Sequence, residues 1–371
     1  MTDGAFVNTM TAGRFSSSFL CILLLLTTSC KVEPSFIDDS NSIVVRIGED
    51  NQIKAFIKGW HILQLDDSAS PVGYIDKIKV KDNKYFILDR HISHSISCFD
   101  ETGKYIGGFG KQGRGPGEYV EPTDFVVTDS SVVVLDQFSR QILSYRLDGA
   151  FIAARKLPCS IYEMELSPDG KGFYFMTGAN RRGSEYAGFE IIKADGSANV
   201  LDLQVASKYK MNYSSGLTLH SCGNKLYYSK PFRTDIIELT EQGPKVSYKL
   251  LFEENGLPSD FESRSKGDFE KFRNEYPLSK YNVFSGSMWE SESYVCFGLY
   301  QKGVKYVMIY EKASRQTLLY PQSIISNKGQ VDSVSVLLSN LTNSVYVSED
   351  RVYVPLNNSL SESTCVAVLE L

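Results

Sequence analysis

Hydrophobic residues from about position 60 onward occur in short runs separated by Gly, Asp and Asn. Runs of this kind that are rich in Val, Ile, Tyr and Phe predict β-strands joined by tight turns. Two successive segments repeat the same order of strands and turns. The strands are 75–80, 85–89 and 95–100 in the first segment, and 123–127, 132–136 and 141–145 in the second. The pattern therefore predicts a repeated, strand-rich unit.

Four turn glycines give the length of the repeat. Gly103, Gly149, Gly196 and Gly243 follow one another at intervals of 46, 47 and 47 residues. Four short strands with their turns need about this length, and a period of roughly 40 to 50 residues is typical of β-propeller blades. The spacing therefore predicts a β-propeller.

The strand pattern divides the propeller into six blades. Blade six shows only three strands, and the run 60–65 precedes blade one without a blade of its own. We therefore expect this run to complete blade six, which would close the ring and remove a free sheet edge. The predicted blades are 75–109, 122–157, 161–203, 217–252, 284–320 and 343–371. The prediction is an all-β, six-bladed β-propeller closed by an N-terminal strand.

An insertion at about 253–281 separates blades four and five. Ser259-Asp260-Phe261-Glu262 is typical of a helix start, and Phe261, Phe269 and Phe272 have spacings that fit one apolar stripe before Pro277. Gly267 is unfavourable inside a helix. We therefore expect a small, partly helical insertion.

The N-terminal region has the pattern of a targeting segment. The apolar run 19–26 is too short to span a bilayer, and it ends in Thr27-Thr28-Ser29-Cys30. Small residues before Cys30 resemble the lipobox of bacterial lipoproteins, in which that cysteine is lipidated, although Thr27 stands where Leu is usual. An ordinary cleaved signal or an uncleaved anchor are the alternatives. Lys31 does not resemble an inner-membrane retention signal, so the resemblance implies an outer-membrane lipoprotein on the periplasmic or cell-surface side.

These patterns divide the chain into three parts. Residues 1–29 form the lipoprotein signal peptide, 30–59 the tether and N-terminal strand region, and 60–371 the propeller. The net charge of −5 and the isoelectric point near 5.6 provide no basic field for a phosphate backbone. We therefore expect no nucleic-acid partner, and we expect the protein to bind the membrane only through the lipid anchor.

Five cysteines follow Cys30, and none has metal-ligand spacing. They are Cys98, Cys159, Cys222, Cys296 and Cys365. Outside the cytoplasm a disulfide between Cys159 and Cys222 is conceivable, but an odd set without a paired pattern argues against a disulfide framework.

The stretch 111–119 combines three glycines with Pro116. A phosphate-binding loop is one interpretation of such a stretch, but no Gly-Lys-Ser/Thr follows and the next element is a strand. The favoured interpretation is the crossover from blade one to blade two, which leaves Arg114 at its tip able to contact a ligand.

Several motifs together resemble a known family. They are Leu88-Asp89, the Gly113 to Tyr119 stretch, Pro122-x-Asp124-Phe125 and Val134-Leu135-Asp136. With the lipoprotein leader, they are similar to the Bacteroides-type six-bladed β-propeller lipoproteins, which are related to NHL repeats. The resemblance is sharp over about 74–149 and implies the fold and the anchor, but leaves the activity open.

The candidate binding residues fall in turns that the propeller topology places on one face. They are Asp89, His91, Arg114, Asp136, Arg181 and Arg182. Asp89 and Asp136 either accept hydrogen bonds from the following turn or form part of a carboxylate ring for a cation such as calcium. Only two blades carry this Asp, so a full ring is not supported. His91 and His94 are expected to be exposed turn residues, with His94 at the same turn position as Arg140.

These observations favour a binding or protein-interaction module, expected to be a monomer, for an unknown protein, peptide or glycan ligand. No catalytic residue and no cofactor is assigned, because no Ser/His/Asp constellation and no zinc spacing occurs. One alternative is a metal-dependent hydrolase or lyase of the six-bladed type with a cation in the central channel. Another is a structural component of an envelope complex.

Overall fold

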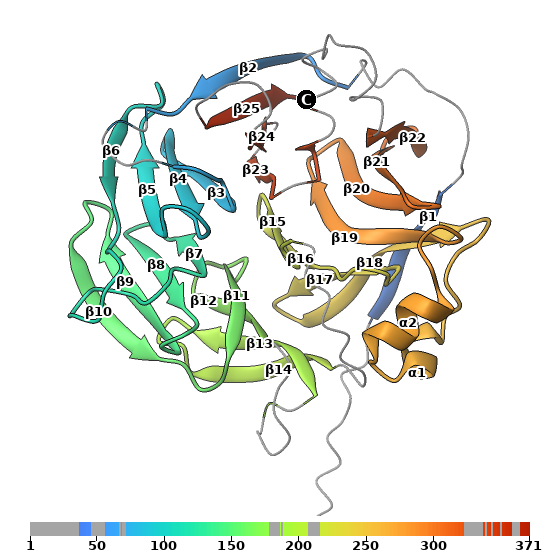
Figure 1. The fold of residues 1–371 in the computed structure, drawn as a ribbon, viewed down its shortest axis with the longest axis horizontal. Coiled ribbons are helices and arrows are strands. Elements are labelled where there is room, and N and C mark those ends of the chain that lie inside the picture. The colour runs from blue at the N-terminus through green and yellow to red at the C-terminus, as the bar shows by residue number, and fades with distance from the viewer. Residues whose placement is uncertain are drawn as a thin grey trace, which may run out of the picture. The chain divides into compact units, whose positions relative to one another are not determined.

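A computed structural model describes residues 37–45, 56–66, 68, 72–177, 186, 188–206, 216–322, 337, 340–342, 344–348, 351–357 and 364–371. Pro34–Leu371 form one compact unit. Its sheets are arranged as the blades of a propeller around a central channel (Figure 1), as the sequence predicted. No helix in the described residues is long and apolar enough to cross a membrane.

Blades one, two, three and five are four-stranded antiparallel sheets. Blade one consists of β3 (Lys77–Lys81), β4 (Lys84–Asp89), β5 (Ser95–Phe99) and β6 (Tyr105–Gly108). Blade two consists of β7 (Asp124–Val127), β8 (Ser131–Asp136), β9 (Gln141–Arg146) and β10 (Phe151–Lys156). Blade three consists of β11 (Ile161–Leu166), β12 (Gly172–Thr177), β13 (Phe189–Asp195) and β14 (Val200–Ala206). Blade five consists of β19 (Asn282–Glu290), β20 (Tyr294–Gln301), β21 (Val304–Glu311) and β22 (Gln316–Pro321).

Blade four has a fifth strand that the sequence pattern did not place. Its own strands are β15 (Leu219–Cys222), β16 (Lys225–Tyr228), β17 (Asp235–Thr240) and β18 (Gly243–Phe252). Strand β1 (Ile37–Val45) lies parallel to β18, with Ile43 opposite Leu250. Ile43 is buried in the apolar cluster shared by blades four to six. The segment expected to be a tether and strand region thus adds an outer strand to blade four.

Blade six joins the two ends of the propeller. It contains β23 (Tyr346–Ser348), β24 (Arg351–Leu356), β25 (Cys365–Glu370) and, as its outer strand, β2 (Gly59–Gln64). Strand β2 runs antiparallel to β25, from Gly59 opposite Glu370 to Gln64 opposite Cys365. The predicted closure of the ring by an N-terminal strand is therefore confirmed. A single parallel bridge between Cys222 and Val347 also joins β15 of blade four to β23.

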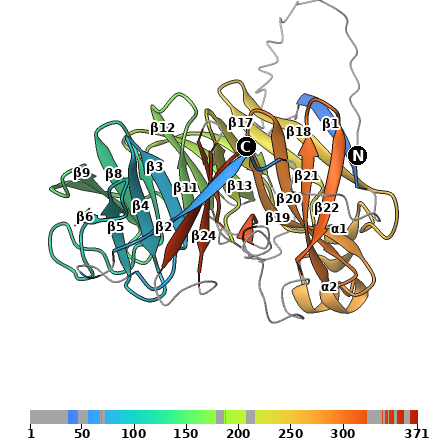
Figure 2. The same cartoon turned by 90° about the horizontal axis from the view of Figure 1, so that it is seen from above.

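The insertion before blade five forms two short helices and not one. They are α1 (Phe261–Ser265) and α2 (Phe269–Glu275), and Figure 2 shows them at one face of the propeller. Lys266 and Gly267 have φ of 52° and 78°, which ends α1, and Asp268 caps α2 by accepting from Lys271 N at 3.0 Å. The predicted continuous stripe is wrong for Phe269. Its side chain is 45% exposed, because the break rotates it away from the core that holds Phe261 and Phe272.

The Gly-rich stretch is the crossover from β6 to β7. Gly113 N donates to Tyr119 O at 2.8 Å, and Tyr119 N donates back to Lys111 O at 3.1 Å, so the loop is tightly folded. Tyr119 is fully buried beneath it. Gly117 has φ of 74°, and a Cβ there would lie 2.8 Å from the Phe151 ring. The loop's glycines therefore serve close chain packing.

The five described cysteines are buried thiols without a disulfide. The Cys159–Cys222 disulfide that the sequence left conceivable is absent from this structure. Cys159 lies with the apolar residues between blades two and three, and Cys222 with those of blades four to six. The two residues therefore belong to different parts of the core.

Candidate functional site

The central channel contains a cavity of about 280 Å³. Its wall comes from blades one, three, four, five and six, chiefly from their inner strands. Tyr74, Gly216 and Leu341 also line it, and each precedes the inner strand of its blade. The cavity therefore reaches the face at which the inner strands begin. We call this the crossover face, because it also carries the 111–119 loop and the α1–α2 insertion.

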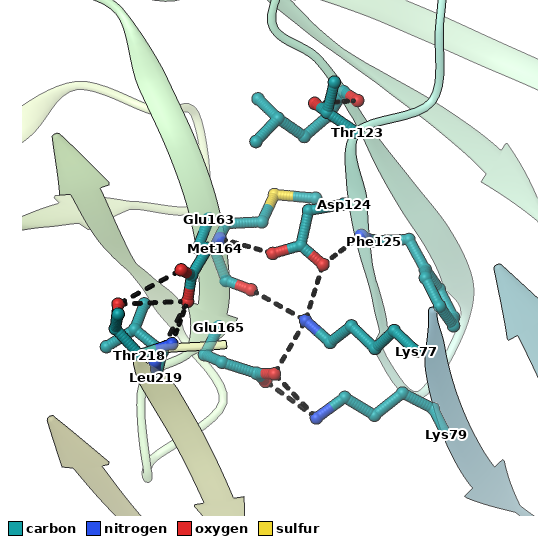
Figure 3. A network of polar contacts seen from close by, with 11 residues as sticks. Lys77, Lys79, Thr123, Asp124, Phe125, Glu163, Met164, Glu165, Thr218 and Leu219 are labelled. Carbon is teal, nitrogen blue, oxygen red and sulfur yellow. Dashed lines mark hydrogen bonds and ion pairs between the residues drawn. The ribbon is translucent and has the colours of Figure 1, made fainter. Parts of the chain in front are cut away.

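Lys77 is the centre of a buried ionic network in the wall (Figure 3). Its ammonium group lies 2.7 Å from Asp124 Oδ1, 2.8 Å from Glu165 Oε1 and 3.2 Å from Met164 O. Three acceptors match its three N–H donors. Burial lowers the pKa of Lys77, but the carboxylates of Asp124 and Glu165 raise it more, so it lies above its ordinary value. Lys77 thus carries a fixed, paired charge that links blades one, two and three.

Lys79 lies on the same face of β3, two residues along, and shares Glu165. Its ammonium group lies 2.8 Å from Oε1 and 2.9 Å from Oε2 of that carboxylate. It also lies 5.1 Å from the centre of the Tyr346 ring. Burial raises the pKa of Glu165, but the two lysines lower it further, so the net pKa is below its ordinary value. Burial lowers the pKa of Lys79 below its ordinary value, although the carboxylate of Glu165 acts to raise it.

Asp124 contacts only donors. Oδ1 accepts from Lys77 Nζ and from Phe125 N at 2.7 Å, and Oδ2 accepts from Met164 N at 2.7 Å. Burial raises the pKa of Asp124 above its ordinary value, although the ammonium group of Lys77 acts to lower it. The contacts favour the ionised form, because a protonated carboxyl would find no acceptor for its O–H among them.

Glu163 connects blade three to blade four. Oε2 accepts from Thr218 N at 2.7 Å and from Leu219 N at 3.0 Å, and the Thr218 hydroxyl lies 3.1 Å from both oxygens. Burial raises the pKa of Glu163 to about 7, although the two backbone N–H groups lower it. A protonated Glu163 can donate to the Thr218 hydroxyl, so both protonation states have partners.

His220 is the imidazole in the cavity wall. Nε2 lies 2.9 Å from Ser229 Oγ and 3.2 Å from Gly286 O, while Ser229 Oγ donates to the same carbonyl at 2.6 Å. Because a carbonyl only accepts, Nε2 carries the proton and Nδ1 is left as an acceptor. Burial lowers the pKa of His220 to about 4. The ring is therefore neutral near pH 7.

The wall also carries hydroxyl groups that make no hydrogen bond to any residue the structure describes. They belong to Tyr74, Ser221, Ser287 and Ser344. Apolar wall is supplied by Met288 and Trp289, and the Trp289 indole N–H already donates to Leu341 O at 2.9 Å. The cavity thus combines paired charges, an imidazole acceptor and hydroxyls available to a ligand.

Asp89 and Asp136, both predicted as site residues, are fully buried turn carboxylates. Asp89 Oδ2 accepts from Gly73 N at 2.8 Å and from Tyr74 N at 3.3 Å, and Oδ1 accepts from Ile92 N at 2.9 Å. Asp136 accepts from Val120 N at 2.9 Å, one repeat further on. Asp89 therefore holds the segment that brings Tyr74 to the cavity. Ligand binding by either carboxylate stays a prediction.

His91 and Arg114 lie on the crossover face. His91 is exposed, its Nε2 lies 3.2 Å from Asp76 Oδ1, and its ring packs edge-on against Tyr74 at 6.2 Å. Arg114 is exposed at the tip of the 111–119 loop. Their ligand contacts, too, stay predictions. Cys30, Arg181 and Arg182 lie outside the described residues.

His94 and Arg140 share a turn conformation, as the repeat alignment predicted. Their φ angles are 50° and 49°, both in the left-handed region. His94 is half-buried and not an exposed turn residue. The sequence spacing did not reveal this partial burial.

A second buried ionic cluster fixes the insertion to the propeller. Glu190 of blade three contacts Lys230 Nζ at 2.7 Å and Arg233 Nη1 at 2.9 Å. Arg233 Nε also contacts Glu262 of α1 at 3.0 Å. Burial raises the pKa of Glu190, but Arg233 and Lys230 lower it to about 2. The cluster is built to hold α1 against blades three and four.

The sequence analysis did not identify the channel residues, although a signal was present. Lys77 and Lys79 alternate with apolar residues in one inner strand, and Glu163 and Glu165 do so in another. Side chains two residues apart share a face of a strand. Charges of opposite sign on the channel-facing side of two inner strands could have predicted the network.

In the part of the chain that the structure describes, no group of three or more His, Cys, Asp and Glu residues is placed to hold a metal ion. The carboxylates of the channel are instead engaged by lysine and backbone donors. Metal binding at the channel mouth remains an untested expectation.

Solved structures share the fold, among them two from Bacteroides. A Bacteroides fragilis protein described as exported is 19% identical with a TM-score of 0.72, and the match covers 89% of this chain and 99% of that one. A member of the DUF4221 family from Bacteroides vulgatus is 8% identical with a TM-score of 0.50, covering 85% and 96%. Among curated proteins, none matches the sequence. At these identities the likeness establishes the fold alone.

Residues 37–339 match the model of a family, DUF5128, that is described as a 6-bladed β-propeller. The match runs from β1 to the region before β23 and so includes five blades and most of the cavity wall. It agrees with the closed ring seen in the structure. The chain therefore belongs to this family of six-bladed β-propellers.

Proposed function

We propose that the protein is an extracytoplasmic binding module whose ligand enters the central channel from the crossover face. The cavity carries this proposal. Its volume of about 280 Å³ is close to the lower end of the range for small-molecule sites, about 300 Å³. Its wall is mainly polar, with apolar surface from Met288 and Trp289, and converging polar groups of this kind fix the orientation of a ligand.

The buried network supports a site that is rigid before the ligand arrives. Lys77 joins carboxylates from blades two and three, and Glu163 joins blade three to blade four. Asp89 fixes the backbone of Tyr74. A wall held in this way loses little conformational entropy on binding, and such preorganisation favours affinity.

The leader supports an extracytoplasmic location with a lipid anchor at Cys30. Incorporation of radiolabelled palmitate by the parent and its loss in Cys30→Ser would support the anchor. Unlabelled parent protein, or equal labelling of the variant, would contradict it.

The binding proposal is tested by thermal unfolding of the purified chain with a panel of amino acids, dipeptides, monosaccharides, nucleosides and dicarboxylates. A ligand at about 100 times its Kd stabilises the fold by about 2.7 kcal/mol, which is a measurable shift. Ser287→Trp fills the cavity wall. Ser130→Trp is the matched control, because Ser130 is exposed in the β7–β8 turn.

We expect at least one compound to raise the Tm of the parent and of Ser130→Trp, but not of Ser287→Trp. A compound that stabilises all three proteins equally binds outside the channel and contradicts the proposal. A panel that shifts none of them also contradicts it for small ligands.

A further inference from the structure

We propose that the channel cavity takes a neutral, hydroxyl-rich small molecule of the size of a monosaccharide. This inference rests on the proposed function, since it names the ligand class of the same site. Two features of the wall carry it: its charged groups are already paired, whereas several of its hydroxyl groups are not.

The charges in and behind the wall cancel. Lys77 and Lys79 are paired with Asp124 and Glu165 at 2.7 to 2.8 Å, and all four side chains are buried. His220 adds no charge near pH 7. A charged ligand would have to separate one of these pairs, and a buried ion that loses its partner is strongly unfavourable. A neutral ligand displaces only water.

Glu163, a further ionisable group beside the network, is not one of the residues that line the cavity. Its carboxyl is held by Thr218 and Leu219 of blade four. Its protonation near pH 7 therefore leaves the charge balance of the lining groups unchanged.

Tyr74, Ser221, Ser287 and Ser344 line the cavity from four parts of the fold. They belong to the segment before β3, to β15, to β19 and to the segment before β23. Each hydroxyl can donate one hydrogen bond and accept others, and none is engaged by a described residue. A ligand that carries hydroxyls on several sides can exchange hydrogen bonds with all of them.

The remaining wall suits the ring of such a ligand. Trp289 and Tyr346 supply aromatic surface, and His220, whose Nδ1 is left as an acceptor, also lines the cavity. The C–H face of a pyranose can pack on aromatic surface while its hydroxyls reach the serine side chains. The proposal therefore commits to a saccharide-like ligand and not to a peptide or a carboxylic acid.

The test uses pyranoses that differ in charge on one skeleton. Glucose and N-acetylglucosamine are neutral, glucosamine is a cation and glucuronate is an anion. Binding of each to the purified chain in detergent is measured by saturation-transfer NMR and calorimetry at pH 7. We expect the neutral sugars to bind at least about tenfold more tightly than both charged analogues, which corresponds to about 1.4 kcal/mol.

Ser287→Ala and Ser287→Trp separate the possible outcomes. We expect Ser287→Ala to weaken binding of neutral sugars severalfold and Ser287→Trp to abolish it. If a charged analogue binds as tightly as the neutral sugars and Ser287→Trp abolishes its binding, the neutral class is wrong but the channel is still the site. If no sugar binds while another panel compound shows channel-dependent binding, the saccharide class is likewise wrong. If sugar binding survives Ser287→Trp, the inference and the proposed function both fail.

Discussion

Replacing Glu163 by Gln should change the pH dependence of stability in a defined window. Burial raises the pKa of Glu163 from 4.5 to about 7. Between these values the folded state holds a proton that the unfolded state has lost. Stability therefore falls as pH rises through this window, and the loss ends near pH 7. At about 1.4 kcal/mol per pKa unit, the loss is about 3 kcal/mol.

The glutamine side chain in the Glu163→Gln variant would keep an oxygen for the N–H groups of Thr218 and Leu219 and would have no proton to lose. The variant should be more stable than the parent by only about 1 kcal/mol near pH 5 and by about 3 kcal/mol near pH 8. His220 acts in the opposite direction, because burial lowers its pKa to about 4 and stability is lost as pH falls below the unfolded value. This contribution is common to both proteins and cancels in the difference.

The assay is urea unfolding of the purified chain at half-unit steps from pH 5 to pH 8, followed by tryptophan fluorescence. Glu165→Gln is the matched control, because the lysines beside Glu165 lower its pKa. This variant should be destabilised by a nearly constant amount over the same range. Parallel curves for the parent and Glu163→Gln would refute the reasoning about Glu163.

Three further substitutions test the packing of the ring. Lys77→Met should cost about 3 to 5 kcal/mol, because it leaves Asp124 without a cation and Glu165 with Lys79 alone. Lys81→Met, at an exposed ion pair, should leave urea midpoints unchanged, and equal effects of the two substitutions would contradict the network. Gly117→Ala should lower the free energy of unfolding in urea by about 1 to 3 kcal/mol, because φ at this position is 74° and the new Cβ would contact Phe151. Gly107→Ala, where a Cβ would meet open space, should lower it less. Leu63→Ala, at a buried position of β2, should lower stability by about 2 to 5 kcal/mol. Ile62→Ala, on the exposed side of the same strand, should lower it far less, and similar losses would argue against the closing strand.

The repeat of strands and turn glycines was sufficient to predict the six blades and the closing strand. The reason is physical: each blade reuses one order of strands, so the period survives in the turns even where blades three to six lose the Asp89-like position. The match of Gly59–Gln64 to β25 follows from the missing strand of blade six.

The site was less predictable because it is formed between blades. Lys77 and Glu165 meet only when three inner strands converge on the channel, and neither local pattern contains the other. Asp89 was identified from its position at a strand end, but its part in holding Tyr74 depends on a segment sixteen residues earlier. The sequence analysis did not place β1 beside β18, because two parallel strands are not joined by a hairpin turn that a sequence pattern could show.

The most direct test of the account is a crystal structure of the chain soaked with N-acetylglucosamine. The account predicts density for one sugar in the central cavity, with its hydroxyls within hydrogen-bond distance of Tyr74 and Ser287 and the Lys77–Glu165 pair intact. A cavity that holds only water while the sugar sits elsewhere on the surface would contradict it.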